Sequence, residues 1–300
     1  MKKTKFILGL ICLALIIAFF VINKLHNETT QNELDIFSIN VNKGEKIEIA
    51  PENKSVQILY KKIEKDFISK VYDEFETYEN NNFYIDELVT YNDLSDESKL
   101  YYAYQQLEDI ERKWFNNCDE LSGYYLNEKS ISQICKSNPL IIKKDYSSEE
   151  WFFNNVTKEK LEEAYQNLYG IDKQLPKKDF AMSYIGRCIY SSEKDDYLCY
   201  KVTGSNTSLN ETKTKIIKVI KYHDYIEIYD KYIWIENKYQ GTQYKQDYYK
   251  SHLKKEIIVS KTTPTSTIDE KIIDSGALYK HIFKKDSKNN YYWYSSERIE

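Results

Sequence analysis

The amino-acid sequence predicts an α+β fold: an N-terminal transmembrane helix, then an extracytoplasmic domain with a helical N-terminal half and a mostly antiparallel β-sheet C-terminal half. Three observations support this prediction. They are a long uncharged segment near the start, apolar residues at helical spacing up to about residue 175, and apolar alternation after Pro176. Because the helices precede the strands rather than alternating with them, the order favours α+β over a parallel α/β sheet.

The uncharged segment spans residues 6–22 and predicts a signal anchor. As a helix it would be about 26 Å long, which is enough to cross the hydrocarbon of a bilayer. Three lysines lie in residues 1–5, so residues 1–5 should be cytoplasmic, and the polar tether 23–34 and everything after it should be outside. The segment ends without the small residues of a cleavage site, which favours an uncleaved anchor over a cleaved signal peptide.

Residues 35–175 are predicted to be mainly helical. They open with a hairpin pattern over residues 36–49, which turns at Asn42–Glu45. Helical spacing then predicts three helices, one from Val56 to about Phe75, one from Ser95 to about Phe115 and one between Thr157 and Gly170. Ser95 and Thr157 are suitable N-caps, and Gly170 stands where a left-handed C-terminal cap belongs.

Residues 176–300 are predicted to form an antiparallel β region that packs with the helical region as one extracytoplasmic unit. The strand signals come in three pairs: 180–190 with 197–203, 214–222 with 225–236, and 277–284 with 291–298. Residues 238–275 are polar and predict a long excursion with one strand at Ile257–Val259.

Four cysteines follow the apolar segment: Cys118, Cys135, Cys188 and Cys199. An even number in an oxidising compartment predicts two disulfides, for which three connectivities exist. The rival interpretation, a zinc site, is disfavoured because zinc ligands usually come in more closely spaced pairs. We favour the sequence-local pairs Cys188–Cys199 and Cys118–Cys135.

The Cys188–Cys199 pair follows from hairpin geometry. A turn centred between Glu193 and Lys194 places Tyr190 opposite Tyr197 and Cys188 opposite Cys199. Directly opposed residues have Cα atoms roughly 4.5–5.5 Å apart, which a disulfide can span.

The search for chemistry assigns no catalytic, cofactor-binding or metal-binding residue. Phosphate loops, dinucleotide fingerprints and the zinc-protease and serine-hydrolase motifs are all missing from the sequence. An S-x-x-K spacing occurs at Ser191–Lys194 and at Ser251–Lys254, but without the K-T-G strand that accompanies it in penicillin-binding proteins. His223 beside Asp224 is interpreted as a solvated turn residue, because no nucleophile can be placed next to it.

Composition and charge limit the partners. The formal net charge of −4 disfavours nucleic acid as a partner, and abundant Lys, Asn, Ile and Tyr indicate a bacterial genome of low GC content. The leading hypothesis is a non-enzymatic interaction module that is tethered to the membrane through residues 6–22 and binds an envelope protein, a peptide or a wall polymer. The alternatives are an extracytoplasmic hydrolase with a site assembled from distant residues, and an accessory subunit of a membrane complex.

Overall fold

The computed structural model describes only part of the chain. The described residues are 35–63, 71–72, 77–78, 84, 87–107, 112–113, 150–183, 186–203, 210–251, 256–264 and 268–300. The predictions for residues 6–22 and for the Cys118–Cys135 pair lie outside them. Among the described residues, no helix is both long enough and apolar enough to cross a membrane.

The described residues form a mostly antiparallel β protein with three short α-helices, so the predicted α+β class is wrong. The helices are α2 (Lys54–Tyr60), α3 (Asp96–Gln105) and α7 (Lys158–Tyr169), and the short 3-10 helices are η1 (Tyr91–Asp93) and η2 (Glu270–Ser275). The N-terminal half, for which the sequence predicts helices, supplies strands to both large sheets. Apart from Glu150–Thr157, those strands have only two or three residues, and they pair with distant segments, so local spacing gave no signal for them.

The larger sheet has the order β1-β10-β11-β14-β15-β4, and every described pair in it is antiparallel. Its strands are β1 (Ile47–Ile49), β4 (Val89–Thr90), β10 (Asn210–Lys221), β11 (Tyr225–Gln240), β14 (Ala277–Lys285) and β15 (Tyr291–Arg298). The predicted pairing of 214–222 with 225–236 and of 277–284 with 291–298 is therefore confirmed.

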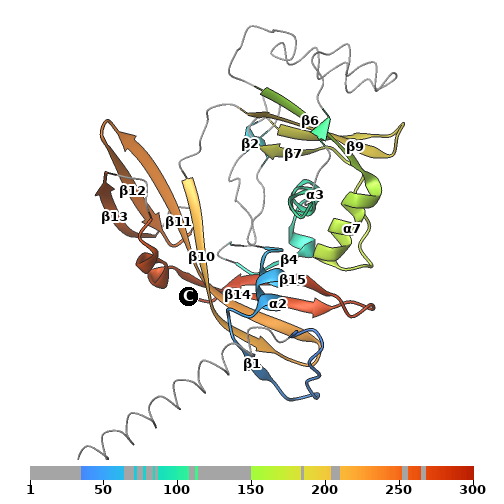
Figure 1. Ribbon diagram of the computed structural model, residues 1–300, viewed down its shortest axis with the longest axis horizontal. Coiled ribbons are helices and arrows are strands. Elements are labelled where there is room, and N and C mark those ends of the chain that lie inside the picture. Colours follow the sequence, from blue (N-terminus) through green and yellow to red (C-terminus); the bar gives the residue numbers. More distant parts are fainter. Residues whose placement is uncertain are drawn as a thin grey trace, which may run out of the picture.

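An arm extends from this sheet where β11 continues past its pairing with β14 (Figure 1). The arm consists of Trp234–Gln240 of β11, the facing part of β10, and the strands β12 (Gln243–Tyr249) and β13 (Ile257–Thr263). It corrects the expectation of a polar excursion over residues 238–275. One strand face buries Ile233, Ile235 and Tyr248 under η2. The buried polar residues Gln246 and Asp247 are accommodated because they form hydrogen bonds with Asn237 and Ser260.

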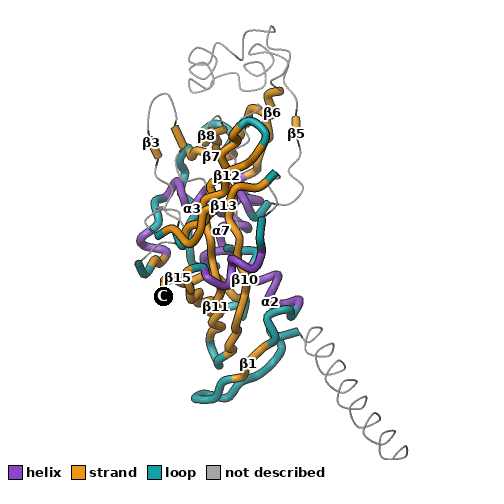
Figure 2. Tube along the Cα trace, turned by 90° about the vertical axis from the view of Figure 1, so that its left-hand side faces the viewer, coloured by secondary structure: helices purple, strands orange, loops and turns teal. Residues whose placement is uncertain are grey.

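The smaller sheet has five strands among the described residues, in the order β5-β6-β9-β8-β7. Its strands are β5 (Arg112–Lys113), β6 (Glu150–Thr157), β7 (Phe180–Ser183), β8 (Gly186–Ser191) and β9 (Asp196–Thr203), and a separate two-stranded ladder joins β2 (Val71–Tyr72) to β3 (Thr77–Tyr78). Helices α3 and α7 form a layer between the two large sheets (Figure 1, Figure 2).

The N-cap predictions were right, and the predicted extent was right for the helix between Thr157 and Gly170 but too long for the other two. The Ser95 hydroxyl accepts from Ser98 N and the Thr157 hydroxyl from Lys160 N, as expected. Gly170 ends α7 with a positive φ of 104°, but its ψ of 148° is extended rather than left-handed helical. The second helix ends at Gln105 rather than near Phe115, because β5 follows it.

Helix α2 is far shorter than the predicted helix from Val56 to Phe75. After Tyr60 the chain tightens into i to i+3 hydrogen bonds, from Lys62 N to Leu59 O and from Ile63 N to Tyr60 O. Val71 and Tyr72 then lie in a strand. The single helix predicted from Val56 to Phe75 therefore does not continue through Val71.

The hairpin predicted over residues 36–49 is also corrected. Its turn exists, with Glu45 N bonded to Asn42 O and Gly44 at a φ of 90°. The strand Ile47–Ile49, however, pairs with Val219–Lys221 of β10 rather than with residues 37–41. Ile47–Ile49 is therefore an edge strand of the larger sheet, paired with a distant segment instead of with the neighbouring one.

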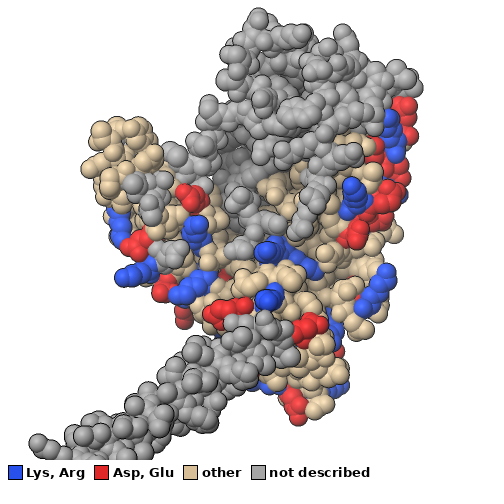
Figure 3. Space-filling view, viewed as in Figure 1, with Lys and Arg blue, Asp and Glu red and all other residues tan. Residues whose placement is uncertain are grey.

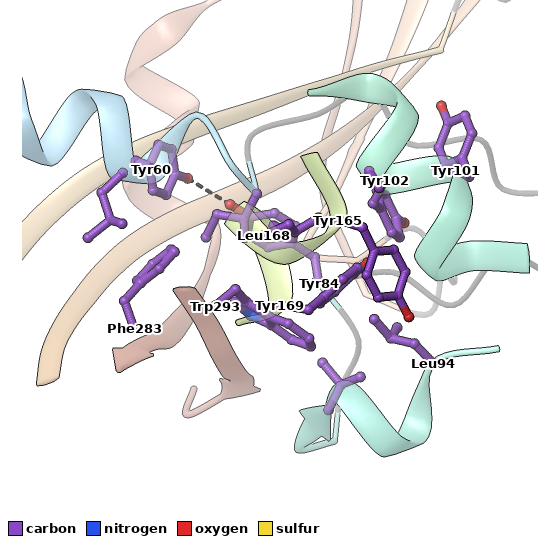
Figure 4. Close-up of a cluster of buried hydrophobic side chains, with 14 of the residues drawn as sticks. Tyr60, Tyr84, Leu94, Tyr101, Tyr102, Tyr165, Leu168, Tyr169, Phe283 and Trp293 are labelled. Atoms are coloured by element: carbon purple, nitrogen blue, oxygen red, sulfur yellow. Dashed lines mark hydrogen bonds between the residues drawn. The ribbon is translucent and has the colours of Figure 1, made fainter. Parts of the chain in front are cut away.

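One core cluster joins the helices to both sheets. It includes Leu161 and Tyr169 of α7, Cys188 and Cys199 of the smaller sheet, and Trp293 of the larger sheet, all almost fully buried. Figure 4 shows how tyrosine rings from α2, α3 and α7 meet Trp293 and Phe283 in this core. Elements from both halves of the chain thus depend on the same buried apolar surface for their stability.

Candidate functional site

Two groups of polar side chains are candidates for a functional site. One is a buried hydrogen-bond network built on Asp230, His281 and Ser296. The other is an open pocket between α2, the C-terminal end of α7 and the β14–β15 turn. Their accessibility decides what each of them can do.

The buried network is positioned by strand register and by one β-bulge. His281 of β14 faces Ser296 of β15, and Asp230 of β11 faces Tyr279, two residues before His281 on the same face of the sheet. The register shifts between Ile282 and Phe283, which leaves Tyr294 as the extra residue. The bulge turns both Trp293 and Ser296 into the core, although they are three residues apart.

The network forms one directed chain of hydrogen bonds. Trp293 Nε1 donates to Ser296 Oγ at 2.9 Å, and Ser296 Oγ lies 2.6 Å from His281 Nδ1. His281 Nε2 lies 3.1 Å from Asp230 Oδ1. With the proton of a neutral His281 on Nε2, the serine donates to the imidazole and the imidazole donates to the carboxylate, so every donor has an acceptor.

Two tyrosine hydroxyls are the other hydrogen-bond donors to the Asp230 carboxylate. The Tyr60 hydroxyl donates to Asp230 Oδ2, the Tyr84 hydroxyl does so at 2.7 Å, and the two hydroxyl oxygens are 2.7 Å apart. Burial raises the pKa of both phenols well above the usual value, and the Asp230 carboxylate raises it further. Both groups therefore stay protonated and act as donors to a buried carboxylate.

The Asp–His–Ser grouping has the same residue types as a catalytic triad, but its surroundings do not suit catalysis. Asp230, His281 and Ser296 each have 0% of their surface exposed, so no substrate carbonyl can approach the serine. The Ser296 oxygen already accepts from Trp293, and the serine contacts Nδ1 rather than the Nε2 of the catalytic arrangement. We conclude that this network fixes how β11, β14 and β15 pack in the core.

The open pocket has a volume of about 230 Å³. Apolar side chains, three carboxamides and one lysine line it: Phe37, Ile58, Leu59, Lys62, Asn167, Asn289, Asn290 and Tyr291. Phe37 packs on Tyr291 with ring centroids 5.6 Å apart. Ile58 and Phe37 are among the exposed large apolar side chains, at 60% and 37% exposure. An exposed apolar rim beside convergent polar groups is typical of a binding site.

Lys62 holds the pocket together. Its Nζ donates to Asn167 O and Asn167 Oδ1, both at 2.8 Å, and to Tyr291 O at 2.7 Å. Burial lowers the pKa of this ammonium to about 8, and Asp286 opposes that shift. Because an ammonium has three N–H donors, all of them are used, and Lys62 ties α2 to α7 and β15.

A second buried lysine lies behind the pocket. Lys221 Nζ donates to the Tyr291 hydroxyl at 2.8 Å and lies 5.0 Å from the centre of that ring. Burial lowers the pKa of Lys221 to about 8, and the charge of Lys285 adds to this effect. Tyr291 is thus fixed at its backbone by Lys62 and at its hydroxyl by Lys221, which keeps this wall of the pocket rigid.

The carboxamides of the pocket keep unused hydrogen-bonding capacity. Among the described residues, the side chains of Asn289 and Asn290 and the Nδ2 of Asn167 have no hydrogen-bond partner. The backbone N–H of Asn290 donates to Asp286 Oδ1 at 2.9 Å. Asn289 has a left-handed φ of 66° in the β14–β15 turn. The backbone is therefore fixed while the side-chain amides stay free to bind.

The Cys188–Cys199 disulfide predicted from the sequence is confirmed. The two residues are register partners across β8 and β9, as are Tyr190 and Tyr197, and the Cα atoms of the cysteines are 3.9 Å apart. This pair lies in the core and not in the pocket.

The S-x-x-K residues Ser191 and Lys194 close a turn. Ser191 Oγ accepts from the Lys194 backbone N–H at 3.1 Å. His223 is a surface residue at 54% exposure, as the sequence suggested. Neither of these features belongs to the pocket.

Sequence reasoning missed both candidate groups. One signal existed for the network, since His281 continues the inward alternation of Ala277, Tyr279 and Phe283 in β14. The pocket had no such signal, because single asparagines in a chain rich in asparagine carry no pattern.

Comparisons with protein-family models, curated proteins and solved structures found no match to this chain.

Proposed function

We propose that the protein is a non-enzymatic binding module of the bacterial cell envelope and that the pocket beside Phe37, Lys62 and Tyr291 is its binding site. The observation that carries the proposal is a pocket lined both by carboxamides without a hydrogen-bond partner among the described residues and by partly exposed apolar side chains. Such a surface can hold a ligand, and the one amine in its lining, Lys62, already donates all three of its N–H groups to Asn167 and Tyr291. A hydrolase has less support, because the Asp–His–Ser grouping in the described residues is buried.

An extracytoplasmic location is part of this proposal. The disulfide supports it, since disulfides persist mainly in oxidising compartments. The basic start followed by the apolar residues 6–22 supports it too, as a segment that would direct export and hold the chain at the membrane. Over the described residues visible in Figure 3, basic and acidic side chains are interspersed, so an envelope protein, a peptide or a wall polymer suits this surface better than nucleic acid.

The location is tested by expressing the full chain with a C-terminal epitope in a Gram-positive host. Proteinase K added to intact cells should remove the epitope while a cytoplasmic control protein survives. Survival of the epitope until the cells are lysed would refute the location.

Binding is tested by sedimenting the detergent-solubilised full chain with purified cell-wall sacculi. The unmodified protein should co-sediment, and Phe37→Ala should reduce the bound fraction at least fivefold. Tyr239→Ala is the matched control, because it removes another exposed aromatic side chain, on the arm. Equal sedimentation of all three proteins would show that the pocket is not the site.

A further inference from the structure

We propose that the ligand of this pocket is a neutral sugar ring of a polysaccharide. The inference rests on the proposed function, because it assigns a ligand class to the same pocket. Three properties of the lining residues support it, namely their charge, their hydrogen-bonding groups and their shape.

The charge of the pocket disfavours an ionised ligand. Lys62 is the single charged residue among those that line it. All three of its N–H donors are taken by Asn167 and Tyr291, at 2.7 to 2.8 Å. A carboxylate or phosphate would receive no N–H from Lys62, because Asn167 and Tyr291 already accept all three, and a cation would find no carboxylate in the lining.

The hydrogen-bonding groups favour a ligand that is rich in hydroxyls. A carboxamide offers both donors and an acceptor, and a hydroxyl does the same, so the two groups satisfy one another in either direction. Asn289, Asn290 and the Nδ2 of Asn167 supply three such partners. A purely apolar peptide side chain would cover these amides without satisfying them, so each covered amide would weaken its binding.

The shape of the pocket fits one ring with two unlike faces. A sugar ring has C–H groups on a face and hydroxyls around its edge, which match the Phe37–Tyr291 pair and the asparagines respectively. The volume of about 230 Å³ is below the roughly 300–1,000 Å³ of sites for drug-sized ligands. One ring therefore fits inside, and because the pocket is open to solvent, a chain could continue beyond it.

The test is fluorescence anisotropy with fluorescein-labelled chitotetraose, a neutral oligosaccharide, added to the full chain in detergent. We expect saturable binding that unlabelled chitotetraose displaces and that a tetra-alanine peptide with blocked ends does not. Phe37→Ala should weaken binding at least tenfold. Asn289→Gly should do the same, because glycine keeps the left-handed backbone and removes only the amide. Tyr239→Ala should bind like the unmodified protein.

The outcomes separate this inference from the proposed function. Displacement by the peptide, or peptide binding that depends on Phe37 without saccharide binding, would overturn the sugar assignment and keep the pocket as a binding site. Loss of saccharide binding in Tyr239→Ala but not in Phe37→Ala would move the site to the arm and overturn both. A urea midpoint equal to that of the unmodified protein shows that each variant is folded.

Discussion

The Asp230 carboxylate is a buried anion with three hydrogen-bond donors. It accepts hydrogen bonds from His281, Tyr60 and Tyr84, and none of these residues is exposed to more than 4%. In this position an unpaired donor or acceptor costs its full desolvation free energy. The network therefore selects one register of β11, β14 and β15, since a slip by one residue would separate its members.

We expect Asp230→Asn to lower the free energy of unfolding by about 2–4 kcal/mol, because the amide turns an N–H₂ group toward donors. Tyr84→Phe removes one of the three donors and should cost about 1 kcal/mol. Urea unfolding followed by circular dichroism measures both values. A change below about 0.5 kcal/mol for Asp230→Asn, the size typical of surface substitutions, would contradict this view of the network.

The two buried lysines at the pocket predict a dependence of stability on pH. The pKa values of Lys62 and Lys221 are about 8 in the folded protein, against an ordinary value of 10.5. Between these values the unfolded chain binds more protons than the folded one, so the free energy of unfolding rises with pH in that window. Above pH 10 the buried tyrosines act in the opposite direction, because their raised pKa favours the folded state only while they stay protonated.

Urea unfolding at pH 7, 8 and 9 should therefore show stability rising by about 2–3 kcal/mol in total. Lys221→Met removes one of the two lysines and should halve the rise. A stability that falls over this range in the unmodified protein would show that other groups dominate the titration.

Among the elements, the close approach of η2 to β11 depends on Gly276. Its φ of −67° is ordinary, so backbone freedom is not the reason for a glycine here. An added Cβ would instead collide with the backbone oxygen of Tyr232 and approach Ile233 Cγ2 to 2.8 Å. The glycine thus lets η2 cover the apolar face of the arm, where Ile233 and Ile272 are buried.

Gly276→Ala should lower the free energy of unfolding by about 1–3 kcal/mol through overpacking. Gly241→Asn is the matched control. Gly241 has a positive φ of 70° that asparagine tolerates, and an added Cβ there meets nothing within 4 Å. Differential scanning calorimetry measures both variants, and equal melting temperatures would refute the argument from close approach.

Across the molecule as a whole, both large sheets share one core, and this predicts that they unfold together. Cys188 and Cys199 of the smaller sheet belong to the same buried cluster as Trp293 of the larger one. The disulfide closes a loop with a sequence separation of 11, which stabilises the fold by about 3 kcal/mol in the chain-entropy model. Removing it should therefore loosen distant strands as well as β8 and β9.

In the double variant Cys188→Ala, Cys199→Ala, amide hydrogen exchange should accelerate roughly 100-fold both in β9 and in β15. Mass spectrometry of peptides from the two strands measures this, with the unmodified protein as reference. Acceleration confined to β8 and β9 would mean that the sheets unfold as separate units.

Features that depend on neighbours a few residues apart could be predicted from the amino-acid sequence. The Ser95 and Thr157 caps, the β8–β9, β10–β11 and β14–β15 pairings and the Cys188–Cys199 register all follow from such local rules. In each case the partner atoms are brought together by the geometry of one turn or one helix end, so the result depends little on distant contacts. The predicted strand 180–190 is instead divided into β7 and β8, which pair with each other.

Pairings between distant segments arise only when the chain folds. Ile47–Ile49 pairs with β10 and not with the neighbouring segment that the sequence predicted. The predicted helix beyond Tyr60 ends where Lys62 donates to Asn167 and Tyr291. The pocket and the Asp230 network likewise join residues that are far apart in the chain. Their energies come from burial and from hydrogen bonds that exist only after folding, and for that reason no local pattern in the sequence records them.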